Sequence, residues 1–196
     1  MAEYKMGFIG TGNMGSALAR AAAKSGERML LANRTPEKAE ALAAVLGAKV
    51  GTNLQAAAAC EYIFLGVKPQ MLPALLDELR PALLERTDRF LLVSMAAGGK
   101  TGTIRQALGF DCPVVRIMPN LPVASGTGVI LLSPGAQVKE DELCELERLL
   151  QAAGLLMRMP EGQIDAGSAV SGCGPAYVYL FLDALANGGA ACGLRY

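Results

Sequence analysis

The sequence predicts an α/β fold with a doubly wound, mostly parallel sheet, followed by the beginning of a C-terminal α-helical domain. Strand-like and helix-like segments alternate along most of the 196 residues. The strand-like segments are unbroken apolar runs, which are typical of strands that are covered on both faces. The expected strands are residues 5–10, 29–33, 48–50, 62–67, 90–94 and 114–118. Helices between such strands give the βαβ connections of a parallel sheet.

Helix signals separate these strands. Thr35 is placed to cap a helix over residues 36–46, and Gly47 follows its last residue. Residues 139–153 carry leucines on one side and acidic residues largely elsewhere, as an amphipathic helix does. Further helices are expected over residues 14–25, 69–85 and 101–108. Two later strands, expected to join the sheet edge in the antiparallel direction, are residues 128–132 and 154–159.

The composition excludes several classes of function. Eighteen Lys and Arg balance eighteen Asp and Glu, which argues against a nucleic-acid or acidic-membrane partner. Histidine is absent, which argues against Ser-His-Asp and zinc hydrolases, and no metal site is expected. No apolar run reaches the roughly 18 residues of a membrane span, and residues 1–5 lack a signal-peptide pattern. We therefore expect a cytoplasmic protein, with its five cysteines reduced and mostly packed.

Gly10, Gly12 and Gly15 form the pattern G-x-G-x-x-G between the first strand and the first helix. In a dinucleotide-binding turn, the first glycine permits the tight turn, the second admits a pyrophosphate and the third lets helix and strand pack closely. The helix N-terminus adds free N–H groups and partial positive charge. The motif in this context predicts a Rossmann-like dinucleotide site; the alternative is a plain strand–turn–helix that is rich in glycine.

The residues after the second strand indicate which dinucleotide binds. An NAD site usually has Asp or Glu there to bind the ribose 2′-OH, whereas this chain has Asn33, Arg34 and Thr35. Arg34 can pair with a 2′-phosphate, and its two neighbours can donate hydrogen bonds to it. We expect NADPH as the cofactor, with NADH as a second donor; the alternative is that Arg34 is an ordinary surface arginine.

The segment after residue 172 differs from the rest of the chain. Pro175 suits the first turn of a helix, and residues 176–182 are apolar on every side. A helix that is apolar all round is either buried or covered by a partner. Because little of the chain remains to cover this one, we expect residues 175–191 to mediate self-association.

Five segments, taken in order, resemble the pyrroline-5-carboxylate reductase family: GFIGTGNMG, NRT, LGVKPQ, VVRIMPNLP with GTGV, and SGCGPAYVY. The resemblance runs from residue 6 to the end of the chain. It implies an NAD(P)H-dependent oxidoreductase that reduces 1-pyrroline-5-carboxylate to L-proline, the last step of proline biosynthesis. It also implies that the complete protein is a homo-oligomer with a small-molecule substrate.

The resemblance implies which residues contact the cofactor. The loop after the first strand would hold the pyrophosphate, the loops after the second and third strands would surround the adenosine, and later loops would lie along the cofactor toward the nicotinamide. The implied contacts are Ile9, Gly10, Thr11, Gly12, Asn13, Met14, Gly15, Asn33, Arg34, Thr35, Asn53, Gly66, Val67, Lys68, Pro69, Met95, Ala96, Ala97 and Asn120.

Three of these residues also have plain structural interpretations. Lys68 precedes a proline and is consistent with a solvated lysine. Asn120 lies between two prolines and is consistent with a turn former, and Asn53 with a loop residue. No catalytic acid or base is assigned, because an imine can take its proton from solvent before hydride transfer. Asp165 and Asp183 show no spacing that marks a catalytic pair.

Two other functions remain open from the residues. One is an NADP-linked reductase of the β-hydroxyacid dehydrogenase class, which typically carries a catalytic lysine on the helix after the sheet; residues 176–191 contain none. The other is a nucleotide-binding regulatory module.

The expected domains are a dinucleotide-binding domain over residues 1–160 and, over residues 161–196, the start of a helical domain for dimerisation and substrate binding. Family members continue with further helices and a loop that holds the substrate carboxylate. The resemblance therefore implies a cofactor half with an incomplete substrate site, and we expect this chain to bind NADPH but to reduce its substrate poorly.

Overall fold

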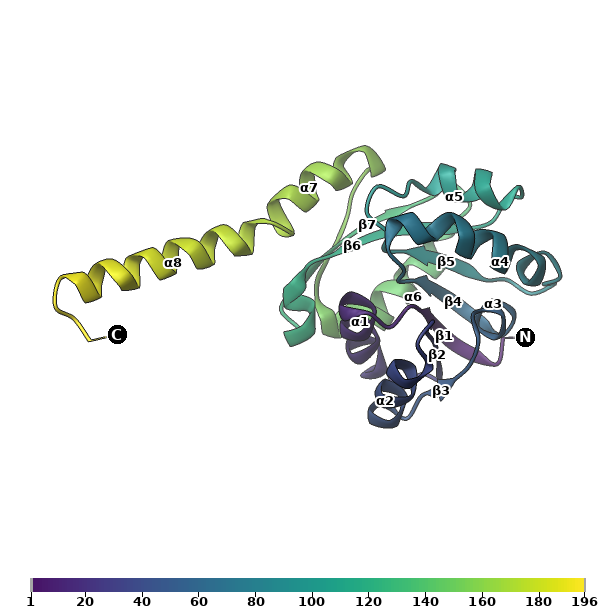
Figure 1. Ribbon diagram of the computed structural model, residues 1–196. Helices are drawn as coiled ribbons and strands as arrows, with labels where there is room; N and C mark the ends of the chain where they lie inside the picture. The colour runs from purple at the N-terminus through teal and green to yellow at the C-terminus, as the bar shows by residue number, and fades with distance from the viewer. Residues whose placement is uncertain (1, 196) are drawn as a thin grey trace.

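The computed structural model describes residues 2–195. The first residue of the predicted dinucleotide-binding domain and the last residue of the predicted helical domain lie outside this part. Eight strands form one sheet (Figure 1). The strands are β1 (Tyr4–Ile9), β2 (Met29–Ala32), β3 (Lys49–Val50), β4 (Cys60–Leu65), β5 (Leu91–Ser94), β6 (Val114–Pro119), β7 (Gly128–Pro134) and β8 (Gly154–Arg158). Their order is β3-β2-β1-β4-β5-β6-β7-β8. The predicted α/β fold is confirmed.

Strands β1 to β6 are parallel, whereas β7 pairs antiparallel with β6 and parallel with β8. Both late strands therefore run against the rest of the sheet, as predicted. The reversal follows from the connection, because only a short 3₁₀ turn, η2 (Leu121–Ser125), separates β6 from β7. A parallel return requires a crossover of a dozen or more residues.

Helices cover both faces of the sheet. They are α1 (Asn13–Ala23), α2 (Pro36–Leu46), α3 (Asn53–Ala59), α4 (Leu72–Leu84), α5 (Thr101–Leu108), α6 (Glu140–Leu150), α7 (Ile164–Ser171) and α8 (Gly174–Ala191). The 3₁₀ turns other than η2 are η1 (Pro69–Met71), η3 (Gln151–Ala153) and η4 (Glu161–Gln163). One core cluster joins α1, α2 and α6 to one face, and a second joins α3, α4 and α5 to the other.

The cores show why the strands are apolar throughout. In β1, Phe8 faces the first cluster and stacks on Phe64 of β4, with 4.3 Å between ring centroids. Its neighbour Ile9 faces the second cluster. Successive side chains of a strand point to opposite faces, so a sheet buried on both sides needs apolar residues at every position.

Two helices were not predicted. The alanine-rich run of α3 begins with a capping box, in which Thr52 Oγ1 accepts from the Gln55 N–H at 3.1 Å and Gln55 Oε1 accepts from the Thr52 N–H at 2.9 Å. Helix α7 is the other. Thr35 does occupy the N-cap position of α2, but its side chain makes no capping hydrogen bond.

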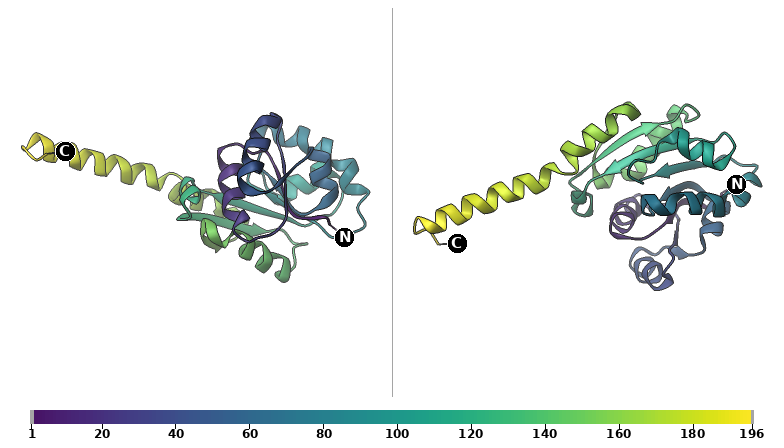
Figure 2. Two further views of the ribbon diagram at one scale, coloured as in Figure 1. Left: turned by 90° about the horizontal axis from the view of Figure 1, so that it is seen from below. Right: turned by 45° about the horizontal axis from the view of Figure 1, so that its top comes forward.

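Helices α7 and α8 form an arm that leaves the α/β domain. Figure 2 shows α8 clear of the domain in both of its views. Polar contacts fix the base of the arm: Glu161 Oε1 accepts from the Thr101 N–H at 2.7 Å, and Asn120 Nδ2 donates to the Ser171 carbonyl at 2.8 Å. The arm is therefore held at its base and bare along α8.

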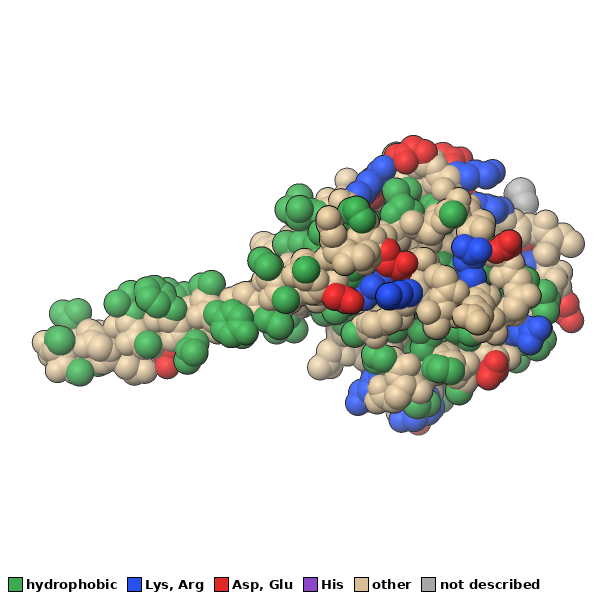
Figure 3. Space-filling view, turned by 90° about the horizontal axis from the view of Figure 1, so that it is seen from above, with side chains coloured by type: hydrophobic (Ala, Val, Ile, Leu, Met, Phe, Trp, Pro, Cys, Tyr) green, Lys and Arg blue, Asp and Glu red, His purple; other side chains and the backbone are tan. Residues whose placement is uncertain are grey.

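The surface of α8 is strongly apolar. Hydrophobic side chains run along its length in Figure 3. Contrary to the expectation from apolar runs, the stretch Glu161–Ala191 is long and apolar enough to cross a membrane by length and composition, with a mean hydropathy of 1.3. None of its most apolar part is buried, whereas Ile164, near the start of the stretch, is buried. The expectation that the cysteines are mostly packed is also wrong, because only Cys60 and Cys112 are buried while Cys144, Cys173 and Cys192 are exposed.

Candidate functional site

The carboxyl ends of the parallel strands meet at one edge of the sheet, and the predicted site residues follow those strands. The strand order reverses between β1 and β4, which is the switch point where open α/β sheets bind ligands. There the Gly66 N–H donates to the Ile9 carbonyl at 2.7 Å, and the Met95 N–H donates to the Leu65 carbonyl at 3.3 Å. The loops after β1, β4 and β5 are thus brought together.

Two glycines of the first loop are required by close packing. Gly10 has φ +95°, and a Cβ added there would lie 2.8 Å from the carbonyl carbon and oxygen of Gly66. A Cβ at Gly15 would overlap the Gly10 carbonyl oxygen. Both positions therefore exclude larger residues for structural reasons, whatever the loop binds.

Gly12 differs, because a Cβ added there would meet no heavy atom within 4 Å. It is exposed and is the N-cap residue of α1, with φ −68°. No side chain caps this helix, and its first turn contains no acidic residue. The first N–H groups of an uncapped helix are free donors at the positive end of its dipole. The space in front of Gly12 therefore fits a phosphate group.

The loop after β2 lies beside the glycine loop. The Thr11 N–H donates to Asn33 Oδ1 at 3.0 Å, and Asn33 Nδ2 donates to the Thr35 carbonyl at 2.9 Å. Arg34 is exposed and forms no ion pair or hydrogen bond within residues 2–195. An exposed, unpaired arginine in the loop that Asn33 joins to the glycine loop suits a second phosphate. The residues present thus fit a dinucleotide that carries an extra phosphate.

Other predicted contacts follow later strands. Gly66 lies against the glycine loop, since a Cβ there would be 2.6 Å from the Gly10 carbonyl oxygen and 3.5 Å from Met95 Sδ. Among the other predicted contacts in these two loops, Val67 is half-buried and Ala96 is buried. The exposed ones are Lys68, Pro69 and Ala97. These segments follow β4 and β5 at the same edge of the sheet as Gly12.

Two predicted contacts use their side chains elsewhere. Asn53 begins α3, and its Nδ2 donates to the Glu78 carboxylate at 3.1 and 3.2 Å. Asn120 is buried; its Oδ1 accepts from the Val129 N–H at 2.8 Å while its Nδ2 donates to the Ser171 carbonyl. Asn120 therefore joins the β6–β7 turn to the base of the arm, and its amide is occupied by protein partners.

Sequence reasoning missed Ser16. This residue lies one position beyond the last glycine of the motif, on α1, and its Oγ donates to the Thr11 carbonyl at 2.7 Å. Thr11 itself is buried, and its hydroxyl has no hydrogen-bond partner among the described residues. The motif spacing gives no signal for Ser16, because the contact depends on how the loop turns onto the helix.

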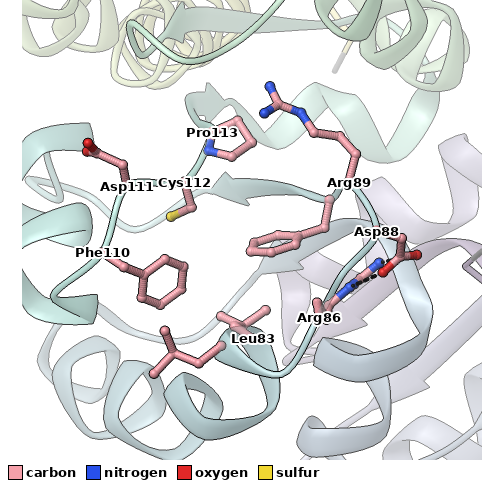
Figure 4. A pocket seen from close by; sticks show the side chains of 10 residues that line it. Leu83, Arg86, Asp88, Arg89, Phe110, Asp111, Cys112 and Pro113 are labelled. Atoms are coloured by element: carbon pink, nitrogen blue, oxygen red, sulfur yellow. Dashed lines mark hydrogen bonds and ion pairs between the residues drawn. The ribbon is translucent and has the colours of Figure 1, made fainter.

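A pocket of about 240 Å³ lies at the opposite edge, near the amino ends of β5 and β6 (Figure 4). Arg86 there donates to the Ala57 carbonyl at 2.8 Å and lies 5.0 Å over the Phe90 ring, so its guanidinium is already engaged. Burial raises the pKa of the Cys112 thiol to about 11, which keeps it protonated and unreactive at neutral pH. This pocket is remote from the predicted site and shows no unsatisfied group that requires a ligand.

Comparisons with known proteins agree with this geometry. Residues 5–98 match the family described as "NADP oxidoreductase coenzyme F420-dependent", and residues 161–196 match "Pyrroline-5-carboxylate reductase dimerisation". The pyrroline-5-carboxylate reductase of Pisum sativum is 33% identical over 98% of this chain and 70% of its own length. Pyrroline-5-carboxylate reductase 3 of Danio rerio is 36% identical over 98% of this chain and 67% of its own length.

Solved structures give the same result. The pyrroline-5-carboxylate reductase of Coxiella burnetii superposes with a TM-score of 0.91 at 30% identity, covering 98% of this chain and 72% of that protein. The Plasmodium falciparum pyrroline carboxylate reductase with NADP bound gives a TM-score of 0.82 at 28% identity, with the same coverage. The chain belongs to the pyrroline-5-carboxylate reductase family.

Proposed function

We propose that this chain binds NADPH at the carboxyl edge of its sheet and acts in the reduction of 1-pyrroline-5-carboxylate to L-proline, the last step of proline biosynthesis. The observation that carries the proposal is the uncapped N-terminus of α1 behind an unobstructed Gly12, with the unpaired Arg34 beside it. These groups match the two phosphate-containing parts of NADPH, which are the pyrophosphate that joins its two nucleosides and the 2′-phosphate on its adenosine. Membership of the family supports the choice of substrate.

Different residues would hold different parts of the cofactor. The free N–H groups at the start of α1 would hold the pyrophosphate. Arg34, with the exposed Thr35 beside it, would hold the adenosine 2′-phosphate. The loops after β4 and β5 would lie along the rest of the molecule, and Asn53 near the adenosine. NADH lacks the 2′-phosphate and would lose the contact with Arg34.

Bound NADPH supplies the hydride; the chain supplies placement and electrostatics. An imine carbon is most electrophilic when its nitrogen is protonated, and that nitrogen can take a proton from solvent. The chain therefore needs no dedicated acid, which agrees with a sequence without histidine. Its contribution is to hold the reacting atoms close and aligned.

We also propose that the dinucleotide-binding domain ends near residue 160 and that the segment after it mediates homo-oligomerisation. The large side chains of α8 are exposed along its length; Phe181 is 66% exposed and Leu180 is 69% exposed. Surfaces of this kind on soluble proteins are interaction sites, and the dimerisation match over residues 161–196 favours a second copy as the partner over a membrane. The proposed location is the cytoplasm.

The direct test is a fluorescence titration of the protein with NADPH and NADH, followed by an assay of proline formed from 1-pyrroline-5-carboxylate. We expect saturable binding that is tighter for NADPH, and slow NADPH oxidation that nevertheless depends on the imine. Failure to bind either dinucleotide would refute the proposal. Tight binding without imine-dependent oxidation would favour a nucleotide-binding regulatory module instead.

A further inference from the structure

The side chain of Asn33 bridges the two loops of the proposed NADPH site. Its Oδ1 accepts from the Thr11 N–H at 3.0 Å in the glycine loop, and its Nδ2 donates to the Thr35 carbonyl at 2.9 Å in the loop after β2. The first contact joins residues 22 positions apart, the second residues two positions apart. Asn33 is half-buried between the loops.

The glycine loop is held at Thr11 from both sides. The Thr11 N–H is occupied by Asn33, and the Thr11 carbonyl accepts from Ser16 Oγ at 2.7 Å. Thr11 is itself only 4% exposed. Its amide is therefore not a free donor for a phosphate, whereas Gly12 and Asn13, which follow it, are exposed. Fixing Thr11 sets the direction in which the free end of α1 points.

We propose that Asn33 is a positioning residue for cofactor binding, which shapes the pyrophosphate loop through Thr11 and the 2′-phosphate loop through Thr35. The inference rests on the proposed NADPH function. It differs from direct contact with the 2′-phosphate in one respect: loss of this positioning residue weakens the binding of NADH as well as that of NADPH, because both carry the pyrophosphate. A direct ligand of the 2′-phosphate affects NADPH alone.

The two halves of the amide have separable roles. Asn33→Ala removes both hydrogen bonds, whereas Asn33→Asp keeps an oxygen that can accept from the Thr11 N–H and loses the donor to the Thr35 carbonyl. The carboxylate also places a negative charge beside the proposed 2′-phosphate position. Ser16→Ala releases Thr11 from its other side without changing the loop after β2.

The experiment is a fluorescence titration of each full-chain variant with both NADPH and NADH. We expect Asn33→Ala to weaken the binding of both dinucleotides by about tenfold, which corresponds to about 1.4 kcal/mol of binding free energy. Asn33→Asp should recover most of the lost NADH affinity but not the NADPH affinity. Ser16→Ala should weaken both dinucleotides by a similar factor. Asn187→Ala on α8, which removes an amide bonded only to Asp183 within the described residues, is the matched control and should change neither.

Three outcomes would overturn the inference: a loss of NADPH affinity alone in Asn33→Ala, no loss in that variant, or equal NADH loss in Asn33→Ala and Asn33→Asp. Urea unfolding of each variant shows whether it is folded at the temperature of the titration. Wild-type protein that binds neither dinucleotide would instead refute the proposed function, so the two failures are distinguishable.

Discussion

Arg116 and Asp165 form an ion pair that joins the sheet to the arm, with 2.6 Å between Nη2 and Oδ1. The Arg116 side chain is 1% exposed, whereas that of Asp165 is 72% exposed. Arg116 Nε is buried and has no hydrogen-bond partner within residues 2–195. A guanidinium this deep in the fold depends on its one carboxylate, and a buried charge without a partner is costly.

Replacement of Asp165 should therefore destabilise the protein. Asp165→Asn leaves the Arg116 charge without a counter-ion and should lower the free energy of unfolding by about 1–3 kcal/mol. The measurement is the midpoint of urea unfolding. Asp183→Asn on α8, far from any buried charge, is the control and should change stability by less than about 0.5 kcal/mol. Equal midpoints for the two variants would show that Asp165 has no role in compensating Arg116.

The acid dependence of stability should include Glu145 of α6. Hydrogen bonding to Arg148, at 2.7 Å, and an ion pair with Lys5, at 3.2 Å, hold the pKa of Glu145 at about 2. Because this pKa is lower than in the unfolded chain, the ionised carboxylate stabilises the fold at neutral pH. That contribution should disappear as the pH falls from about 4.5 toward 2.

Glu145→Gln tests this dependence. The variant should be less stable than the wild type at pH 7, and the difference should shrink to nothing near pH 2, as followed by urea unfolding at several pH values. Glu40→Gln changes an exposed residue of α2, and its free energy of unfolding should depend on pH as that of the wild type does. A stability gap for Glu145→Gln that does not change with pH would assign the effect to packing instead of charge.

Self-association should depend on α8. Phe181→Glu places a charge on a face that a second copy would bury, and should shift the sedimentation coefficient toward that of a monomer. Val45→Glu is a matched control on α2, since Val45 and Phe181 are both 66% exposed. A wild type that sediments as a monomer at every concentration would remove the basis for assigning α8 to a second copy.

Cofactor preference should depend on Arg34. Arg34→Ala removes the proposed partner of the 2′-phosphate. It should lower the affinity for NADPH by at least about tenfold and leave the affinity for NADH unchanged. Arg20→Ala removes another exposed arginine, on α1, and should leave both affinities as they are. If the two arginine variants behave alike in the titration, the 2′-phosphate contact lies elsewhere.

The sheet and most helices could be predicted because their signals are local. The helix Pro36–Leu46 ends at Gly47 with φ +66°, as the glycine after it indicates. Helix α3 was missed because an alanine run has no periodicity, although Thr52 and Gln55 carry a capping box that could have located its start.

The partners of the site residues could not be predicted in the same way. Asn33 and Asn120 both follow strands and both looked available to a ligand. Their amides are instead bonded to Thr11 and Ser171, residues that only the folded sheet brings near them. Periodicity and motif spacing place a residue at an edge of the sheet, but they do not show which polar neighbours it will meet there.

The free N-terminus of α1 is the proposed binding site of the cofactor pyrophosphate, and the Gly12→Asp variant places a negative charge in that site. Aspartate is a favourable N-cap residue, and a Cβ at Gly12 meets no heavy atom within 4 Å, so the variant should be as stable as the wild type or more so. Its carboxylate would occupy the proposed phosphate position and repel the ligand. Gly102→Asp places the same charge on the first turn of α5, where a Cβ also meets nothing within 4 Å, and serves as the control. In a fluorescence titration, we expect Gly12→Asp to lose NADPH and NADH binding while Gly102→Asp keeps both; undiminished NADPH binding by a folded Gly12→Asp protein would show that the pyrophosphate does not bind at the N-terminus of α1.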